Sequence, residues 1–211
     1  MAKPMITSVD MMTEAQIERI VGVFRAALIK QRSEIRSDAV QVVLGTRNLG
    51  RILVDPIYVI AKCTTARWAR NVNRGQSPLE MLRSTGHNVT KPACELAHTM
   101  PKGEGTEGEV IFFKIEDAKY EQVTLAELTA EYRRRGLKAA DPYLVGAINK
   151  ANPDFLKEQQ NQTHWEDPAG GWYTLTFYHD NDMSKGDAHI TKHEAGDKLF
   201  VGNWWYAGVR V

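Results

Sequence analysis

The sequence predicts an α+β protein in which an N-terminal helical bundle precedes an antiparallel sheet domain with two helices on one face. Hydrophobic residues in the first part recur every three or four positions, the period of a helix with one buried side. Toward the C-terminus, aromatic and β-branched residues alternate with polar ones, as in antiparallel strands with one buried face. We therefore expect a helical domain at residues 1–90, a glycine-rich linker at 91–108 and an α+β domain at 109–211.

The first predicted helix begins at a capping box. Thr13 and Gln16 have the spacing at which a hydroxyl and a side-chain amide each satisfy a free backbone N–H at a helix start. The helix is expected to run to about Arg32. Its apolar residues form one stripe, which consists of Ile17, Ile20, Val21, Phe24 and Leu28.

Three further helices are expected before residue 90. A short one covers residues 37–45. A second begins at Asp55-Pro56, where the aspartate caps the helix and proline takes its first position, and it continues past Trp68, which we expect in the core. A third begins at residues 77–80, where serine, proline and glutamate repeat the capping pattern.

The C-terminal part combines strands with two capped helices. Residues 109–115 read as a strand, and Thr124 with Glu127 forms a capping box for a helix that ends near Gly136. Asp141-Pro142 starts the second helix. The remaining strands are expected at 155–159, 172–178, 187–193, 198–202 and 204–210.

Composition indicates a globular protein of the cytoplasm. Hydrophobic residues make up 43% of the chain and charged residues 25%, which is ordinary for a folded protein. No apolar run approaches the roughly 20 residues that cross a bilayer, and the N-terminus lacks an apolar signal core. Cys63 and Cys94 are too few for a disulfide framework and indicate reduced thiols. The oligomeric state stays open.

The first part of the chain is basic, and its arginines are a candidate binding surface. Residues 1–90 hold 13 Lys and Arg against 7 Asp and Glu, whereas residues 91–211 hold 14 against 19. Arg67, Arg70 and Arg74 would share one helix face and could clamp phosphate groups. The same face could instead be solvated or dock on the acidic half. The full candidate set is Arg47, Arg51, Arg67, Arg70, Arg74 and Arg83.

A second candidate site lies between residues 179 and 193. Asp180 and Asp182 alternate as in a loop that wraps a hard cation, although the same residues suit a long hairpin turn. His189 and His193 share a strand face with Thr191, which is compatible with a metal site, a two-histidine phosphoesterase or a solvated polar strand. A second His-x-Thr copy in a strand is missing. The possible cofactor is a divalent cation.

Parts of the chain resemble a module of small uncharacterised bacterial and phage proteins. The resemblance is carried by residues 123–128, 135–140, 152–155 and 204–210 and covers about 109–211. It is a pattern of spacings, and it implies no activity and no catalytic residue.

These observations predict a non-enzymatic binding or interaction protein, with a phage or mobile-element origin suggested by the resemblance. Its partner would be nucleic acid or another protein, and the contacts would come from the basic helical face. The alternative is a metal-dependent or two-histidine hydrolase that acts on phosphodiesters through residues 179–193. A Gly-x-Gly-x-x-Gly match at Gly103 precedes a strand instead of following one, so its context excludes a phosphate-binding loop.

Overall fold

The chain divides into two compact units, Met1–Ile57 and Tyr58–Val211, and each is described by itself. The computed structural model describes residues 12–34, 40, 44, 49–115, 122–179, 185–194, 196–200 and 204–211. The predicted linker at 91–108 falls inside the second unit.

The first unit contains helix α1 (Glu14–Gln31), which has the predicted limits. Thr13 caps it in a capping box with Gln16, and Arg32 closes its C-terminal end. None of its residues is buried, and Phe24 is 42% exposed. A helical bundle is therefore not confirmed. The short helix expected at 37–45 lies outside the described residues apart from two isolated positions.

Helix α3 (Leu49–Lys62) crosses the unit boundary and differs from the prediction at both ends. It begins before Asp55-Pro56 and ends at Lys62, after which residues Thr64–Ala69 form strand β1 instead of more helix. β1 pairs along its whole length with β3 (Gly108–Phe113). This long-range pairing overrides the local helical period, and Trp68 is 54% exposed rather than buried.

Short elements follow β1 and pack into the core of the second unit. Helix α4 (Pro78–Ser84) starts at the predicted Ser77 capping box, and strand β2 (Asn88–Val89) comes next. Helix α5 (Lys91–Leu96) and the 3₁₀ helix η2 (Ala97–Thr99) occupy the start of the predicted linker. Their alanines, together with Met100, are buried, so this stretch belongs to the folded core: Ala93, Ala97 and Met100.

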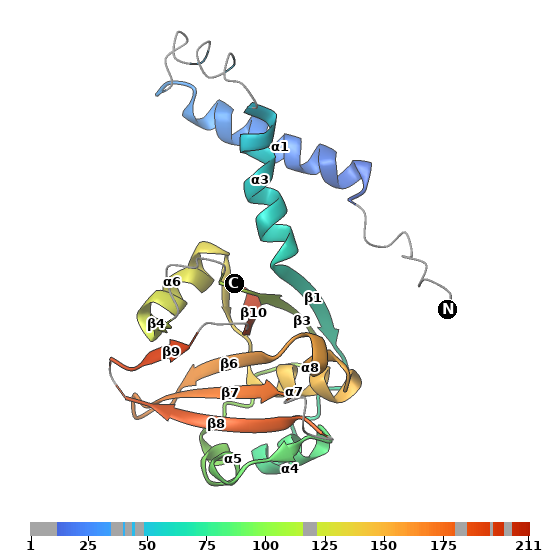
Figure 1. Cartoon of the computed structure of the whole chain (residues 1–211), viewed down its shortest axis with the longest axis vertical. Helices are drawn as coiled ribbons and strands as arrows, with labels where there is room; N and C mark the ends of the chain where they lie inside the picture. The colour runs from blue at the N-terminus through green and yellow to red at the C-terminus, as the bar shows by residue number, and fades with distance from the viewer. Residues whose placement is uncertain are drawn as a thin grey trace. The chain divides into compact units, whose positions relative to one another are not determined.

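The main sheet has eight strands in the order β1-β3-β10-β6-β7-β8-β2, with β5 also paired to β10 (Figure 1). Most pairs are antiparallel, but β10–β6 and β2–β8 are parallel. A smaller sheet joins β4 to β9. The bounds of the remaining strands are β4 Gln122–Thr124, β5 Leu137–Ala139, β6 Asn161–Glu166, β7 Trp172–Tyr178, β8 Asp187–His193, β9 Lys198–Phe200 and β10 Trp205–Arg210.

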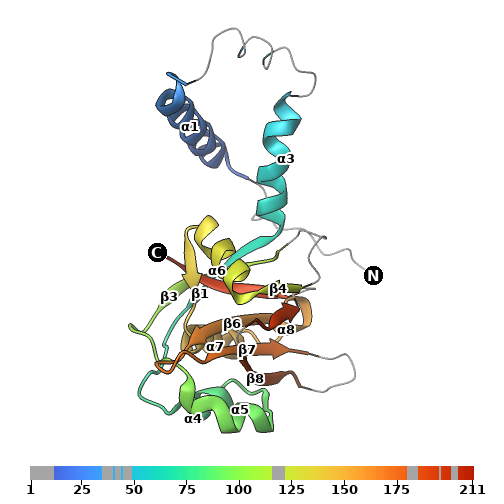
Figure 2. The same cartoon turned by 90° about the vertical axis from the view of Figure 1, so that its left-hand side faces the viewer.

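The α+β class is confirmed, but the helices occupy both sheet faces instead of one. Helix α7 (Pro142–Ala151) packs with α4, α5 and the short helix α8 (Phe155–Glu158) into a large core on one face. Helix α6 (Leu125–Arg134) packs with β4 and β9 into a second core on the other face. Figure 2 shows α6 beside β4 and shows α4 and α5 beside β8. The strand expected at 155–159 was wrong, because these residues form α8.

No helix among the described residues is long and apolar enough to cross a membrane.

Candidate functional site

The face of the main sheet that carries α6 is only partly covered, and its open part is polar. The register of β6, β7 and β8 places two cross-strand rows of polar side chains on this part. One row consists of Gln162, Thr176 and His189, and the next consists of His164, Thr174 and Thr191. On the opposite face the intervening residues of the same strands, such as Leu175 and Ile190, are fully buried.

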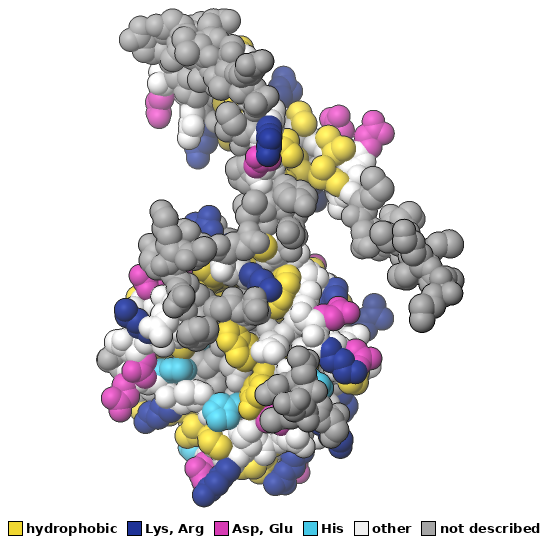
Figure 3. Space-filling model, in the orientation of Figure 1, with side chains coloured by type: hydrophobic (Ala, Val, Ile, Leu, Met, Phe, Trp, Pro, Cys, Tyr) yellow, Lys and Arg dark blue, Asp and Glu magenta, His cyan; other side chains and the backbone are white. Residues whose placement is uncertain are grey.

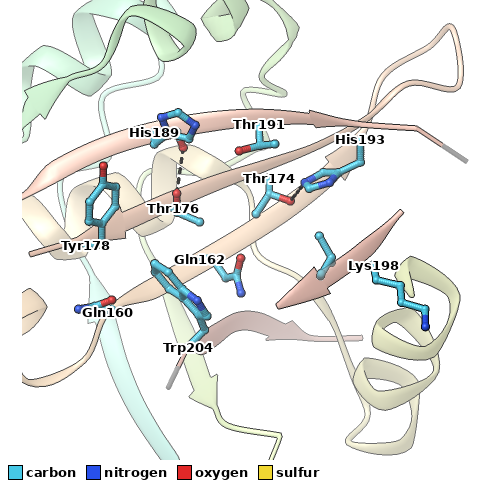
Figure 4. Close-up of a pocket in the computed structure, with 11 residues that line it drawn as sticks. Gln160, Gln162, Thr174, Thr176, Tyr178, His189, Thr191, His193, Lys198 and Trp204 are labelled. Atoms are coloured by element: carbon cyan, nitrogen blue, oxygen red, sulfur yellow. Dashed lines mark hydrogen bonds between the residues drawn. The ribbon is translucent and has the colours of Figure 1, made fainter. Parts of the chain in front are cut away.

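Five of these six side chains line a groove with a volume of about 370 Å³ (Figure 4). The sixth, His164, packs against the rings of Tyr132 and Trp172 instead. Figure 3 shows histidine side chains at the surface of the unit that holds the sheet, among hydrophobic and uncharged side chains. No Asp or Glu among the described residues lines the groove. All lining residues except Leu199 are polar or aromatic. They are Gln160, Gln162, Thr174, Thr176, Tyr178, His189, Thr191, His193, Lys198, Leu199 and Trp204.

One end of the groove is aromatic. The rings of Tyr178 and Trp204 meet edge to face with their centroids 6.4 Å apart. The Tyr178 hydroxyl donates to the Asp187 carboxylate over 3.2 Å, and the Gln160 side-chain amide donates to the His179 carbonyl over 3.2 Å. These bonds hold the aromatic and amide groups in place at this end.

The other end carries His193 and Lys198, and the Lys198 side chain extends away from His193 (Figure 4). His193 Nε2 lies 2.7 Å from the Thr174 hydroxyl, and its Nδ1 lies 4.0 Å from a carboxylate oxygen of Asp197. Burial lowers the pKa of His193, and the Asp197 carboxylate opposes this effect. Lys198 is exposed. The lowered pKa favours the neutral form of His193, and no carboxylate among the described residues lines this end.

His189, in the middle of the site, is tied to the neighbouring helix. Its Nδ1 lies 3.0 Å from the hydroxyl of Thr90, the residue that caps α5. Its backbone carbonyl accepts a hydrogen bond from the Thr176 hydroxyl over 3.3 Å. The imidazole orientation is thus fixed by the fold.

Several polar atoms on this side of the sheet are buried without a well-formed hydrogen bond. They include Nδ1 of His164, and also Nε2 of Gln162 and the hydroxyl of Tyr206, whose side chains interact with each other. The three residues His164, Gln162 and Tyr206 are 7%, 5% and 1% exposed. Burial lowers the pKa of His164 to about 4, with a smaller contribution from His193, and burial raises the pKa of Tyr206. An unpaired buried polar group typically destabilises a protein by roughly 1–3 kcal/mol. The indole nitrogens of Trp165 and Trp205, in the core of the opposite face, also lack partners, so such groups occur on both faces.

The structure brings together two of the four residues predicted as a metal or hydrolase site. His189 and His193 share a face of β8 with Thr191, as the strand pattern predicted. Asp180 and Asp182 lie outside the described residues. Among the described residues, no three His, Cys, Asp or Glu side chains come close enough to hold a metal ion.

The arginines predicted as a helical binding face lie on different elements. Arg67 is on β1 and Arg70 follows it, so the expected helix face is wrong. Arg74 forms an ion pair of 2.8 Å with Asp141, in which the two side chains are 14% and 16% exposed. It also donates to the carbonyls of Lys102 and Gly105. Arg74 therefore fastens the loop before β3 to the start of α7.

The other arginines of that set are dispersed. The Arg67 guanidinium lies 5.4 Å from the centre of the Phe155 ring. Arg51 pairs with Asp55 within α3, and Arg83 is an exposed residue of α4. Arg47 lies outside the described residues.

Sequence reasoning missed most of the groove. Thr174, Thr176 and Tyr178 alternate with buried residues along β7, and this alternation of hydroxyl groups was the available signal. Gln162, Lys198 and Trp204 come from other strands and connections, so only the tertiary pairing places them beside the histidines. The chain matches no family model, no curated protein sequence and no solved structure.

Proposed function

We propose that the chain is a non-enzymatic binding protein that holds a small polar ligand in the groove on the open sheet face. One observation carries the proposal. The side chain of Gln162, whose residue is 5% exposed, lines the groove beside Thr176 in the register of β6 and β7. A protein selected for stability alone would place apolar side chains there.

The size and lining of the groove support a small-molecule site. Ligand pockets commonly have volumes of about 300–1,000 Å³ and combine aromatic surface with a few fixed polar groups. The groove, at about 370 Å³, lies at the small end of this range. Hydrogen bonds within the protein fix several of its polar groups, including Thr174 and His189. A ligand would therefore meet a site that is already organised.

A hydrolase that uses His193 is the second candidate. Asp197, His193 and Thr174 stand in the order carboxylate, imidazole, hydroxyl, and the 2.7 Å contact favours this reading. However, Thr174 is 4% exposed, so its hydroxyl is poorly placed to attack a substrate. The 4.0 Å separation of Asp197 from the imidazole exceeds hydrogen-bond distance. Binding without catalysis is the simpler proposal.

Binding of nucleic acid or a protein through exposed arginines stays a separate prediction. Arg51, Arg67, Arg70 and Arg83 are exposed, whereas Arg74 is engaged by Asp141. Titration of labelled DNA and RNA at two salt concentrations tests it, because phosphate contacts weaken steeply with salt. If Arg67→Glu and Arg70→Glu leave such binding unchanged, this surface is not the site.

A pair of adjacent substitutions tests the groove proposal. Thr191→Trp would fill the groove, whereas Lys192→Trp places the same ring at the next, exposed position of β8 as a matched control. The unfolding temperature is measured with a panel of nucleotides, sugars, sugar phosphates and dicarboxylic acids. We expect at least one compound to raise it for the natural chain and for Lys192→Trp but not for Thr191→Trp. A panel that never separates the two variants would contradict the proposal.

A further inference from the structure

We infer that helix α1 pairs antiparallel with α1 of a second copy of the chain, so that the protein is a dimer in solution. The pairing concerns the first unit alone and does not involve the groove. Two features of α1 support it, namely an exposed apolar stripe and the order of the charges along one side of that stripe.

Helix α1 exposes the apolar stripe that its sequence predicts. The stripe includes Ile17, Val21, Phe24 and Leu28, which are 43%, 54%, 42% and 60% exposed. Figure 3 shows hydrophobic side chains at the surface of this helix. In proteins, most of the stability of a helix comes from packing of its apolar face against a neighbour. A second helix laid along the stripe would supply that packing.

One flank of the stripe is acidic in the first half of α1 and basic in the second. Glu14 and Arg32 are 18 residues apart, which is five turns of about 3.6 residues, so they point in the same direction. Glu18 and Arg25 lie within roughly 40° of that direction, at about 100° per residue. All four side chains therefore stand on the side of the stripe nearest Val21.

These four charges have no opposite charge within reach on their own helix. Side chains three or four positions apart are neighbours on a helix surface. At these spacings within α1, Glu14 meets the like charge of Glu18, and Glu18, Arg25 and Arg32 meet no opposite charge. Complementary charge must therefore come from another element.

An antiparallel copy of the same helix supplies this complementary charge. In an antiparallel pair of identical helices, each flank faces the same flank of the other chain in reverse order, and such flanking charges set partner and orientation. Glu14 then lies close to Arg32 of the second copy, and Glu18 lies close to Arg25.

The same arrangement also matches the apolar residues. With the two helices centred on each other, Ile17 lies opposite Leu28 of the second copy, and Val21 lies opposite Phe24. A parallel pair would instead place the charged flank against the opposite flank, which contains Ile20, Val23 and Ala27 and no charge. Only the antiparallel order therefore joins the stripes and pairs the charges.

Reversal of the charges on half of the flank tests the pairing. Sedimentation equilibrium is measured on the full chain, on Glu14→Lys/Glu18→Lys, whose flank is entirely basic, and on Arg25→Glu/Arg32→Glu, whose flank is entirely acidic. We expect the natural chain to dimerise and each variant to dimerise at least tenfold more weakly. An equimolar mixture of the two variants should dimerise again, because a basic flank then meets an acidic one. Such recovery would show that neither variant fails merely by unfolding.

A matched control reverses charges on the far side of α1. Arg19→Glu/Lys30→Glu changes the same number of side chains on the face opposite the stripe, so it should leave dimerisation unchanged. Phe24→Ala removes the largest apolar side chain of the stripe and should weaken dimerisation without any change in charge.

Three outcomes would overturn the inference. A natural chain that is monomeric at every concentration has no such pairing, and its sedimentation with vesicles of phosphatidylcholine and phosphatidylglycerol would assign the stripe to a lipid surface. A dimer that neither the charge reversals nor Phe24→Ala weakens uses another surface. A dimer that Phe24→Ala weakens but the charge reversals do not would pair its stripes without the antiparallel order.

Discussion

Strand β7 faces two different environments, and comparing them separates what stabilises this protein from what the groove needs. Leu175 and Phe177 are fully buried on the face covered by α4, α5, α7 and α8. Their neighbours Thr174 and Thr176 point to the opposite face and line the groove. Alternation along a single strand therefore places apolar packing on one side and the polar side chains of the groove on the other.

The covered face should respond most strongly to substitution. Phe177→Ala removes a fully buried ring and is expected to lower the free energy of unfolding by about 3–5 kcal/mol, since the lost burial and the resulting cavity both destabilise. Urea unfolding followed by circular dichroism measures this. Thr176→Val, one residue away on the groove face, should change the same quantity by less than about 1 kcal/mol. Equal losses of stability in the two variants would contradict the distinction between the two faces.

Acid should destabilise the protein through the groove face. Burial lowers the pKa of His164 to about 4 from 6.5, so between these values the unfolded chain binds a proton that the folded chain does not. Stability is therefore highest above pH 6.5 and falls as the pH drops toward 4, by roughly 3 kcal/mol in total. Urea unfolding at pH 7 and pH 4.5 measures the loss.

The substitution His164→Phe identifies the source of this pH dependence. Phenylalanine keeps a ring between Tyr132 and Trp172 but cannot take up a proton. The stability difference between pH 7 and pH 4.5 should shrink in this variant, although His193 and His87, whose pKa values are also lowered by burial, retain part of it. An unchanged difference would show that His164 does not carry the effect.

The covered face holds two buried polar side chains that satisfy each other. Asn149 and Asn161, both fully buried, exchange amide hydrogen bonds of 3.0 and 3.1 Å. Asn161→Ala leaves the Asn149 amide partly unpaired and should destabilise by about 1–3 kcal/mol. Thermal unfolding of this variant, of Asn149→Ala and of the double variant checks the pairing. The loss of stability in the double variant should be smaller than the sum of the losses in the two single variants.

Helix starts and several strands could be predicted from the sequence because their signals are local. The capping boxes at Thr13, Ser77 and Thr124 all form as expected, since each is complete within four residues. The bounds of β7 and β8 also match the predicted strands. Alternation along a strand is likewise visible without knowledge of its partners.

Other elements could not be predicted because their secondary structure depends on pairing with strands that are distant in the sequence. Residues of β1 continue an apparent helical stripe, and only antiparallel pairing with β3 makes them a strand. The central strand β6 contains Asn161, Gln162 and His164, and their polar side chains give no alternating apolar pattern from which a strand could be predicted. They are buried there because amide pairing and the groove face accommodate them. For the same reason, the sequence indicated only three residues of the groove, His189, Thr191 and His193.

The smallest expected effect has the opposite sign from those on the covered face. Gln162→Leu replaces an amide whose Nε2 is buried without a well-formed hydrogen bond, so the unliganded protein should become more stable, by about 1 kcal/mol. The same variant should lose binding of the compounds that the natural chain takes, because the donor at the centre of the groove is gone. Thermal unfolding with and without those compounds measures both effects, and Lys192→Leu is the exposed control. A loss of stability without ligand would indicate that Gln162 serves the fold, and the groove would then no longer differ in kind from the paired amides on the other face.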